Sequence, residues 1–246
     1  MCTVSWLSRP DGYEVFFNRD EQPSRPAGGP RRAVAGEVAY LAPVDLEAGG
    51  TWIAVNQFGV TVCLTNQYPD RAPPPADRIS RGLLLAALVD AESLDRVAGR
   101  VRDLALERYR PFAVAAFEPD ADPMVLRWDG RRLATDRPHS AGMVLTSSGA
   151  TPPDLESTRA GIFAAALEAG VTAAALAAVH RSHLPARGAL SVCMHRPEAS
   201  TVSHSHIVVA HGSRGISFSH APGAPCETAL GDPLTMPRVE RTASSQ

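Results

Sequence analysis

Strand-like segments of this chain come in pairs joined by short turns, and this pattern restricts the fold more than any other feature. The pairs are residues 3–7 with 13–17, 51–56 with 59–66, and 112–117 with 124–128. The first turn contains Pro10-Asp11-Gly12, a combination that favours a tight reversal of the chain. β-rich runs separated by so few residues are typical of hairpins, whose strands pair antiparallel. We therefore expect antiparallel sheets.

Helical periodicity is confined to two blocks between the strand segments. Apolar residues recur at helical spacing over 79–104, with a break near Asp90, and predict two helices. Two more helices are predicted after Asp154 and Thr172, which are suitable N-terminal boundary residues. Further strands are expected at 142–148, 189–195, 204–210 and 215–219. Because helices and strands alternate in blocks, the pattern favours an α+β fold in which helices cover antiparallel sheets as a layered sandwich.

Two other segments carry no such pattern. Residues 21–43 are rich in Pro, Arg and Gly and are predicted to form a surface loop. Small and polar residues follow Pro222, which predicts poor order towards the end of the chain. At 246 residues the chain has the length of one large domain. We expect a single domain over residues 1–235 and a poorly ordered tail over 236–246.

Composition excludes several classes of function. The 24 basic and 26 acidic side chains give a formal net charge of −2, which argues against a nucleic-acid partner. The sequence has no run of eighteen apolar residues and no secretory signal at its start, so we expect a cytoplasmic protein without a membrane span. The four cysteines, at positions 2, 63, 193 and 226, are widely spaced and suggest neither a disulfide framework nor a zinc knuckle. Neither a metal nor an organic cofactor is predicted, and the sequence does not indicate an oligomeric state.

Cys2 follows Met1 directly, so removal of Met1 would leave a residue that carries both a thiol and a free α-amino group. The ordinary pKa values of these groups, about 8.5 and 7.7–8.0, are close enough for a proton to pass between them near neutral pH. The second strand of the first predicted hairpin ends in Asn18-Arg19-Asp20. In an antiparallel pair this end lies next to Cys2, so the sequence predicts that these residues are neighbours.

Four motifs in register carry a family resemblance. They are Met1-Cys2, Asn18-Arg19-Asp20-Glu21, Leu46-Glu47-Ala48-Gly49-Gly50-Thr51-Trp52 and Leu64-Thr65-Asn66, followed by Ser80-Arg81-Gly82 before a helix. Together they resemble the NRDE family, also called the transport and Golgi organisation 2 family. The resemblance implies an αββα sandwich similar to the N-terminal nucleophile hydrolases, and to the choloylglycine hydrolases among them. Those relatives cleave carbon–nitrogen bonds other than peptide bonds.

The resemblance also implies roles for individual residues. Cys2 is the expected nucleophile, and the positive charge of Arg19 is expected to lower the pKa of its thiol. Asp20 is expected to orient the α-amine, and Asn66 to donate to the oxyanion of a tetrahedral intermediate. Asn18, Trp52 and His195 are candidate substrate contacts, although Trp52 also fits a structural role as an aromatic anchor of its loop.

The chain departs from the family pattern in two places. Thr146-Ser147-Ser148 stands where relatives carry a Ser-Asn pair, and residues 202–207 offer no arginine where relatives have one. His204 and His206 lie on one face of the predicted strand, with His195 near by in sequence, which raises the alternative of a metal site. Histidines on strands are more often packing groups held by hydrogen bonds, so we do not predict a metal there.

Two functions follow from these expectations. The first is hydrolysis of a non-peptide amide or thioester bond in a small acyl substrate, with Cys2 as the nucleophile. The alternative is a binding or trafficking protein that keeps the fold and its pocket but holds an acyl lipid, acyl-CoA or haem without chemistry. In both cases the expected partner is a small molecule.

Overall fold

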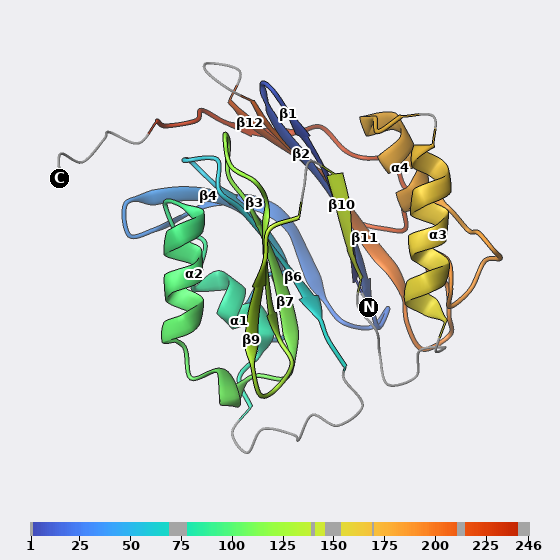
Figure 1. Cartoon of the computed structure of the whole chain (residues 1–246), viewed down its shortest axis with the longest axis horizontal. Helices are drawn as coiled ribbons and strands as arrows, with labels where there is room; N and C mark the ends of the chain where they lie inside the picture. The colour runs from blue at the N-terminus through green and yellow to red at the C-terminus, as the bar shows by residue number, and fades with distance from the viewer. Residues whose placement is uncertain are drawn as a thin grey trace.

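Two antiparallel sheets pack face to face, and a pair of helices covers the outer face of each (Figure 1). The computed structural model describes residues 2–68, 78–138, 141–145, 154–168, 170–210 and 215–240. The arrangement is an α+β sandwich with the layer order αββα, as the sequence predicts. No helix in these ranges is both long and apolar enough to cross a bilayer.

The first sheet contains both ends of the described chain. Its strands lie in the order β10 (Ala141–Leu145), β1 (Cys2–Arg9), β2 (Gly12–Glu21), β11 (Ser200–Ala210), β12 (Ile216–Ala221) and β13 (Leu234–Met236). Helices α3 (Leu155–Leu167) and α4 (Ala173–Arg181) cover its outer face. Thr172 accepts a hydrogen bond from the backbone N–H of Ala175 and so caps α4, as expected.

The second sheet follows the order of the chain from β3 to β9. Its strands are β3 (Ala27–Ala35), β4 (Val38–Asp45), β5 (Ile53–Asn56), β6 (Thr61–Asn66), β7 (Phe112–Phe117), β8 (Met124–Trp128) and β9 (Leu133–Asp136). Helices α1 (Arg81–Ala86) and α2 (Leu94–Asp103) lie against its outer face, and a short 3₁₀ turn spans Leu106–Arg108. The predicted hairpins and helices of this half are confirmed.

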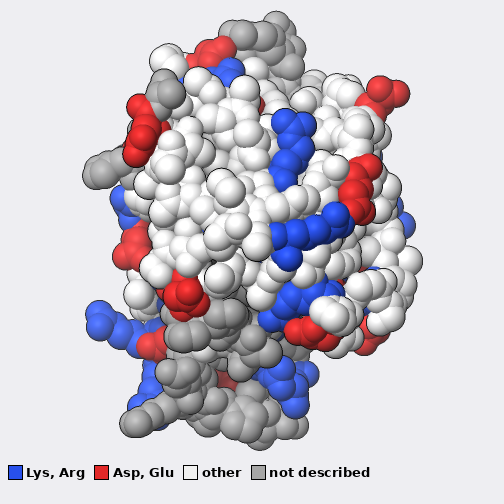
Figure 2. All heavy atoms as spheres, turned by 90° about the vertical axis from the view of Figure 1, so that its right-hand side faces the viewer, with Lys and Arg blue, Asp and Glu red and all other residues white. Residues whose placement is uncertain are grey.

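Apolar side chains fill three layers, one between the sheets and one beneath each helical pair. A strand between two such layers is buried on both faces. Every residue of β7 is buried for this reason, which explains its unbroken apolar sequence. Small residues such as Ala160, Ala164, Ala174 and Ala178 occupy exposed positions of α3 and α4. Figure 2 shows the resulting face, whose middle carries few charged side chains.

The β1–β2 hairpin has a register that places Cys2 opposite Arg19 and Thr3 opposite Asn18. Because side chains alternate along a strand, the first pair faces the space between the sheets and the second faces the α3–α4 layer. Cys2 belongs to the apolar layer between the sheets. Thr3 contacts Arg159 of α3. The proximity predicted from hairpin geometry is therefore confirmed.

The prediction of a surface loop over residues 21–43 is wrong, because most of this segment forms β3 and the start of β4. β3 is the edge strand of its sheet, and most of its residues are exposed or half-buried. An irregularity in its pairing between Gly28 and Arg31 accommodates Pro30. Proline is tolerated at an edge or a bulge because its missing N–H interrupts little of the ladder. The composition of this segment therefore did not indicate that it forms a strand.

The prediction of a strand over residues 189–195 is also wrong. This stretch is irregular, with one isolated bridge between His195 and Ser200. The carbonyls of Leu190 and Ser191 accept hydrogen bonds from a buried arginine, and that of Val192 accepts one from Asn18. These bonds satisfy backbone groups that a strand would have paired in a ladder.

The end of the chain is more ordered than its composition suggests. β13 pairs with β12, and Met236 is buried, so this strand reaches one residue into the predicted tail. Gly142–Leu145 belongs to β10, whereas the Thr146-Ser147-Ser148 departure from the family pattern lies outside the described residues.

Candidate active site

A cavity of about 310 Å³ opens where β1 begins and where β2 and β6 end. Four of the predicted site residues, Cys2, Arg19, Trp52 and Asn66, line it. The rest of its lining is mostly polar, and consists of Glu21, Arg25, Asp45, Ala48, Thr51, Leu64, Arg78, Ile79, Ser80, Arg81, Gly82 and Arg110. Residues far apart in the sequence thus meet at one end of the sandwich.

The Gly49-Gly50-Thr51 segment leads to Trp52, and both Thr51 and Trp52 line the cavity. A Cβ on Gly50 would lie 2.2 Å from the backbone carbon of Gly82, so only glycine allows this segment to meet the start of α1. The N–H of Thr51 donates to the carbonyl of Gly82 at 3.1 Å. Gly49 adopts a positive φ of 72°, which closes the turn that follows Asp45. The structure therefore explains why both positions are occupied by glycine.

Asp45 holds this turn in place. Its Oδ1 accepts hydrogen bonds from the backbone N–H groups of Glu47 and Ala48, and its Oδ2 accepts one from Arg25 Nε at 2.8 Å. Burial opposes ionisation of this carboxyl, but the bonds from Arg25 and Ala48 outweigh it and lower the pKa of Asp45. A stable negative charge at this position also attracts Arg19, whose Nη2 lies 3.7 Å from Asp45 Oδ2.

Trp52 supports Arg19 from the other side. The guanidinium carbon of Arg19 lies 4.2 Å from the centre of the Trp52 ring, within the range of a cation–π contact. Both side chains are almost fully buried. Trp52 therefore has a structural role, as its sequence context allowed. It also lines the cavity, and contact with a substrate there is a proposal.

The thiol of Cys2 is less acidic than the sequence suggested. Burial is the largest influence and raises the pKa of Cys2 above its ordinary value, and the Asp20 carboxylate raises it further. The positive charge of the N-terminal amine, a hydrogen bond from the Asp20 backbone and the charge of Arg19 lower the pKa, but their combined effect is smaller. Cys2 is therefore a neutral thiol at pH 7 unless a base removes its proton.

Asp20 lies on the face of β2 that points towards α3. Its Oδ1 accepts a hydrogen bond of 2.6 Å from the hydroxyl of Thr201, and its Oδ2 lies 3.8 Å from Arg159 Nη1. Burial raises the pKa of Asp20 above its ordinary value, although the positive charge of Arg159 and the Thr201 bond oppose this shift. These contacts fix the carboxylate beside the start of β1.

Arg159 is the principal residue of the site region that sequence reasoning missed. Its side chain is fully buried and donates hydrogen bonds to Thr3 Oγ1 at 3.0 Å and to the carbonyl of Ser191 at 2.6 Å. Burial lowers the pKa of Arg159 below its ordinary value, although the negative charge of Asp20 opposes this shift. A signal was present, because Leu155, Arg159 and Phe163 form one stripe along α3 whose members are all buried. An arginine in an apolar stripe needs an internal partner.

Asn18 is fully buried, and its amide is used inside the protein. Nδ2 donates to the carbonyls of His180 and Val192, while Oδ1 lies 3.0 Å from His180 Nδ1 and 2.8 Å from His204 Nδ1. Burial lowers the pKa of His204 to about 3, so this ring is neutral at pH 7. Asn18 is not among the described residues that line the cavity, and its amide makes contacts within the protein.

The other candidate residues lie in different places. Asn66 is at the cavity, where its Nδ2 donates to the Tyr68 hydroxyl at 3.2 Å. His195 is not among the described residues that line the cavity, and lies instead beside Cys193. His206 is 2.8 Å from Glu14 Oε2 and stacks on Phe16, so it is a packing residue held by a hydrogen bond, as expected.

Comparisons with known proteins bear on both the family and the fold. The sequence model of the family described as Transport and Golgi organisation 2 matches residues 1–151. No curated protein matches the chain in sequence. The structure resembles the C2A mutant of conjugated bile acid hydrolase from Clostridium perfringens, with a TM-score of 0.60 and 10% identity over 100% of both chains. It also resembles a Caenorhabditis elegans ortholog of N-acylethanolamine-hydrolyzing acid amidase, with a TM-score of 0.56 and 10% identity over 85% of this chain and 92% of the other. The likeness shows the fold of the N-terminal nucleophile hydrolases.

The raised pKa of Cys2 can be measured through the rate of its alkylation. A higher pKa leaves less thiolate at neutral pH, so iodoacetamide should modify Cys2 more slowly than the cysteine of an unstructured peptide. In protein that retains Met1, the plot of the alkylation rate against pH should have its inflection at a higher pH than the same plot for the peptide. Peptide mapping of the modified site gives this rate. An inflection below that of the peptide would show that Arg19 outweighs burial.

Replacement of Arg159 tests the buried contact with Asp20. Arg159→Met removes the positive charge and leaves the carboxylate buried without it, which should lower the free energy of unfolding by about 3–5 kcal/mol. Arg96→Met is a matched control, because Arg96 is an exposed residue of α2, and its replacement should change the free energy by less than about 0.5 kcal/mol. Urea denaturation measures both. Equal effects of the two replacements would contradict the account of Arg159.

Proposed function

Because the chain belongs to the transport and Golgi organisation 2 family, we propose that it is a cysteine hydrolase of a non-peptide amide or thioester bond in a small acyl substrate. The nucleophile is Cys2 after removal of Met1. One observation carries the proposal, namely that Cys2, Arg19 and Asn66 line the same cavity at one end of an N-terminal nucleophile hydrolase fold. The similar bile acid hydrolase also has a cysteine at its second position, as the name of its C2A mutant states.

Because the pKa of Cys2 is raised, the mechanism needs a base that removes the proton of the thiol. A buried neutral thiol attacks a carbonyl only if a base takes its proton, and the α-amine of a trimmed Cys2 is such a base on the same residue. Asp20, fixed by Thr201 and Arg159, favours the protonated form of this amine once it has accepted the proton.

The reaction then proceeds in two steps. The sulfur forms a bond to the carbonyl carbon, and the carbonyl oxygen becomes an oxyanion that Asn66 Nδ2 stabilises, a contribution worth roughly 10²–10³ in rate in other enzymes. Collapse of this intermediate breaks the carbon–nitrogen or carbon–sulfur bond, and the leaving group takes the proton from the α-ammonium. Water, activated by the same amine, then hydrolyses the thioester to Cys2 and releases the acid.

The charges around the cavity favour a substrate with an anionic group. Five arginines line the cavity against two acidic residues: Arg19, Arg25, Arg78, Arg81 and Arg110 against Glu21 and Asp45. Arg25 is paired with Asp45 and Arg19 contacts Trp52, whereas Arg78 and Arg110 are exposed. Guanidinium groups bind carboxylates and phosphates well. We therefore favour an acyl compound that carries one of these groups.

A second candidate function is ligand binding without chemistry, and the raised pKa of Cys2 is the observation that favours it. An arginine-lined cavity can hold an acyl-CoA, an acyl lipid or the propionates of haem without a reaction. The two functions differ in what Cys2 contributes, because only hydrolysis requires its sulfur.

Hydrolysis of N-acyl amino acids tests the proposal, because these compounds combine an amide with a carboxylate. The protein without Met1 should release the free acid, and should do so faster than from uncharged N-acyl amines of the same chain length. Cys2→Ala should reduce turnover by at least about 10³-fold. Mass spectrometry of the acid measures the rate.

Cys63→Ala is the control for this experiment, because Cys63 is a second buried thiol in the same apolar layer that does not line the cavity. It should retain turnover. If neither variant changes turnover, hydrolysis by Cys2 is wrong. If the parent protein binds the compounds without turnover and Cys2→Ala binds them equally well, the function is ligand binding.

A further inference from the structure

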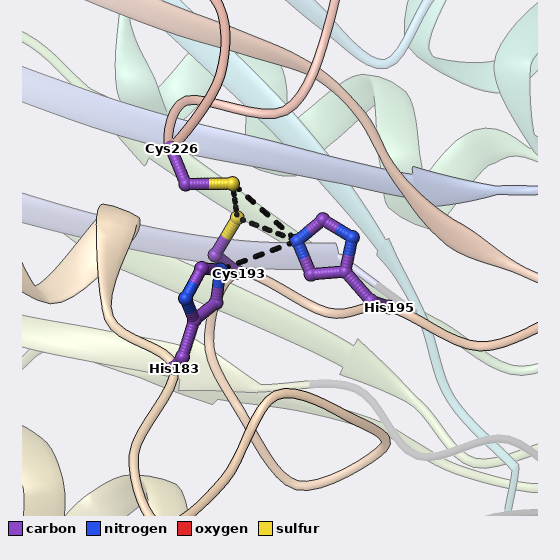
Figure 3. A group of neighbouring side chains, drawn as sticks. All are labelled: His183, Cys193, His195 and Cys226. Atoms are coloured by element: carbon purple, nitrogen blue, oxygen red, sulfur yellow. Dashed lines mark hydrogen bonds between the residues drawn. The ribbon is translucent and has the colours of Figure 1, made fainter.

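A second cluster of reactive side chains lies apart from the described residues that line the cavity. Its members are His183, which follows α4, Cys193 and His195, which precede β11, and Cys226, which follows β12. Figure 3 shows the four side chains pointing towards one another from two connecting segments, one between α4 and β11 and one between β12 and β13. Cys193 is buried and the other three are half-buried.

The distances within this cluster are those of a tetrahedral ligand set. His195 Nε2 lies 3.3 Å from His183 Nε2, 3.5 Å from Cys193 Sγ and 3.4 Å from Cys226 Sγ. The two sulfurs are 3.4 Å apart, and all four ligand atoms lie within 4.8 Å of one another. Zinc bonds of about 2.3 Å to sulfur and 2.0–2.1 Å to nitrogen place tetrahedral ligands roughly 3.3–3.8 Å apart. The separations from His183 to the two sulfurs are at most 4.8 Å, so His183 has to move inwards to complete this geometry.

We propose that His183, Cys193, His195 and Cys226 form a binding site for one Zn²⁺ ion. Two thiolates and two imidazoles are the donor set that zinc prefers in closed structural sites, whereas Mg²⁺ and Ca²⁺ require oxygen ligands. With four protein ligands no position is left open for water, so the site is structural. It is separate from the catalytic chemistry of Cys2.

The residues around His195 fit this role. A histidine that binds zinc through Nε2 carries its proton on Nδ1, which needs an acceptor. Glu227 follows Cys226 directly in the sequence. Arg187 forms an ion pair with this carboxylate and lies 3.3 Å from His195 Nδ1. In this arrangement Arg187 donates to Nδ1, so binding of zinc through Nε2 requires the guanidinium to turn away and leave the Nδ1 proton to the Glu227 carboxylate that it now pairs with.

A disulfide is the alternative use of two neighbouring cysteines. The separation of Cys193 Sγ and Cys226 Sγ is 3.4 Å, whereas a disulfide bond is about 2.05 Å long. A disulfide would also leave the imidazoles of His183 and His195 facing each other without a partner between them. The convergence of both histidines on the sulfurs therefore favours the metal.

Zinc at this position would stabilise the irregular segment between α4 and β11. This segment contributes the carbonyls that bind Arg159 and Asn18. It also holds Met194, whose N–H donates to Thr201 Oγ1 at 2.9 Å, and Thr201 in turn donates to Asp20. Cys193 and His195 flank Met194 in the sequence, so the ion would fix the backbone behind the Asp20 contact. The site would thus position a residue near Cys2 without contacting substrate.

Cobalt titration of the native protein tests the site without any substitution. After removal of bound metal with a chelator, Co²⁺ should bind with a stoichiometry of one per chain and produce the intense visible bands of a tetrahedral ion with a sulfur-to-cobalt charge-transfer band. Zn²⁺ should displace it. Elemental analysis of protein purified without an affinity tag should find one zinc per chain. Absence of both signals, or a Cys193–Cys226 disulfide in the reducing conditions used, would overturn the proposal.

Single substitutions then identify the ligands. Cys193→Ser and Cys226→Ser should each lower the affinity for Co²⁺ by at least about 100-fold and weaken the charge-transfer band, and Glu227→Gln should lower it about 10-fold. Cys63→Ala is the matched control and should leave the spectrum unchanged, because Cys63 lies in the core between the sheets. An unchanged spectrum in both serine variants, or its loss in Cys63→Ala, would show that the ion binds elsewhere.

Discussion

The register of the β1–β2 hairpin is the constraint on which the rest of the site depends. It sets Cys2 opposite Arg19 on the face between the sheets, and Thr3 opposite Asn18 on the face towards α3 and α4. A slip of one residue would exchange these faces, and would place Arg19 under the helices and Asn18 at the cavity. Trp52 packs on Arg19 from the second sheet and so ties this register to the packing of the two sheets.

The two faces of this hairpin have different electrostatic roles. On the cavity side, arginines outnumber acids and suit an anionic group of a ligand. On the helix side, buried polar groups satisfy one another: Arg159 contacts Asp20 and Thr3, and Asn18 links the chain segments that follow α4. The proposed zinc site borders this group of buried polar residues on the helix side. Order around Asp20 therefore depends on elements that are remote from Cys2 in sequence.

Much of the fold could be predicted from the sequence, because hairpins and helix boundaries have local signals. β3 could not, since an exposed edge strand tolerates the proline and glycine that suggest a loop. The part of the site that local motifs encode could be predicted, and it includes the proximity of Cys2 and Arg19. The raised pKa of Cys2 could not be predicted, because burial is a property of the assembled sandwich. The same holds for the Cys193–Cys226 cluster, whose ligands come from segments that only the tertiary structure joins.

In the proposed mechanism, the neutral, buried thiol of Cys2 is activated by its own α-amine. This claim requires a free amine on Cys2, so the mass of the N-terminal peptide of the protein from its native cells tests it most directly. The account predicts a peptide that begins at Cys2 and lacks Met1. A native protein that retains Met1 throughout would contradict the account, because the amine would then be part of a peptide bond and could not accept the proton of the thiol.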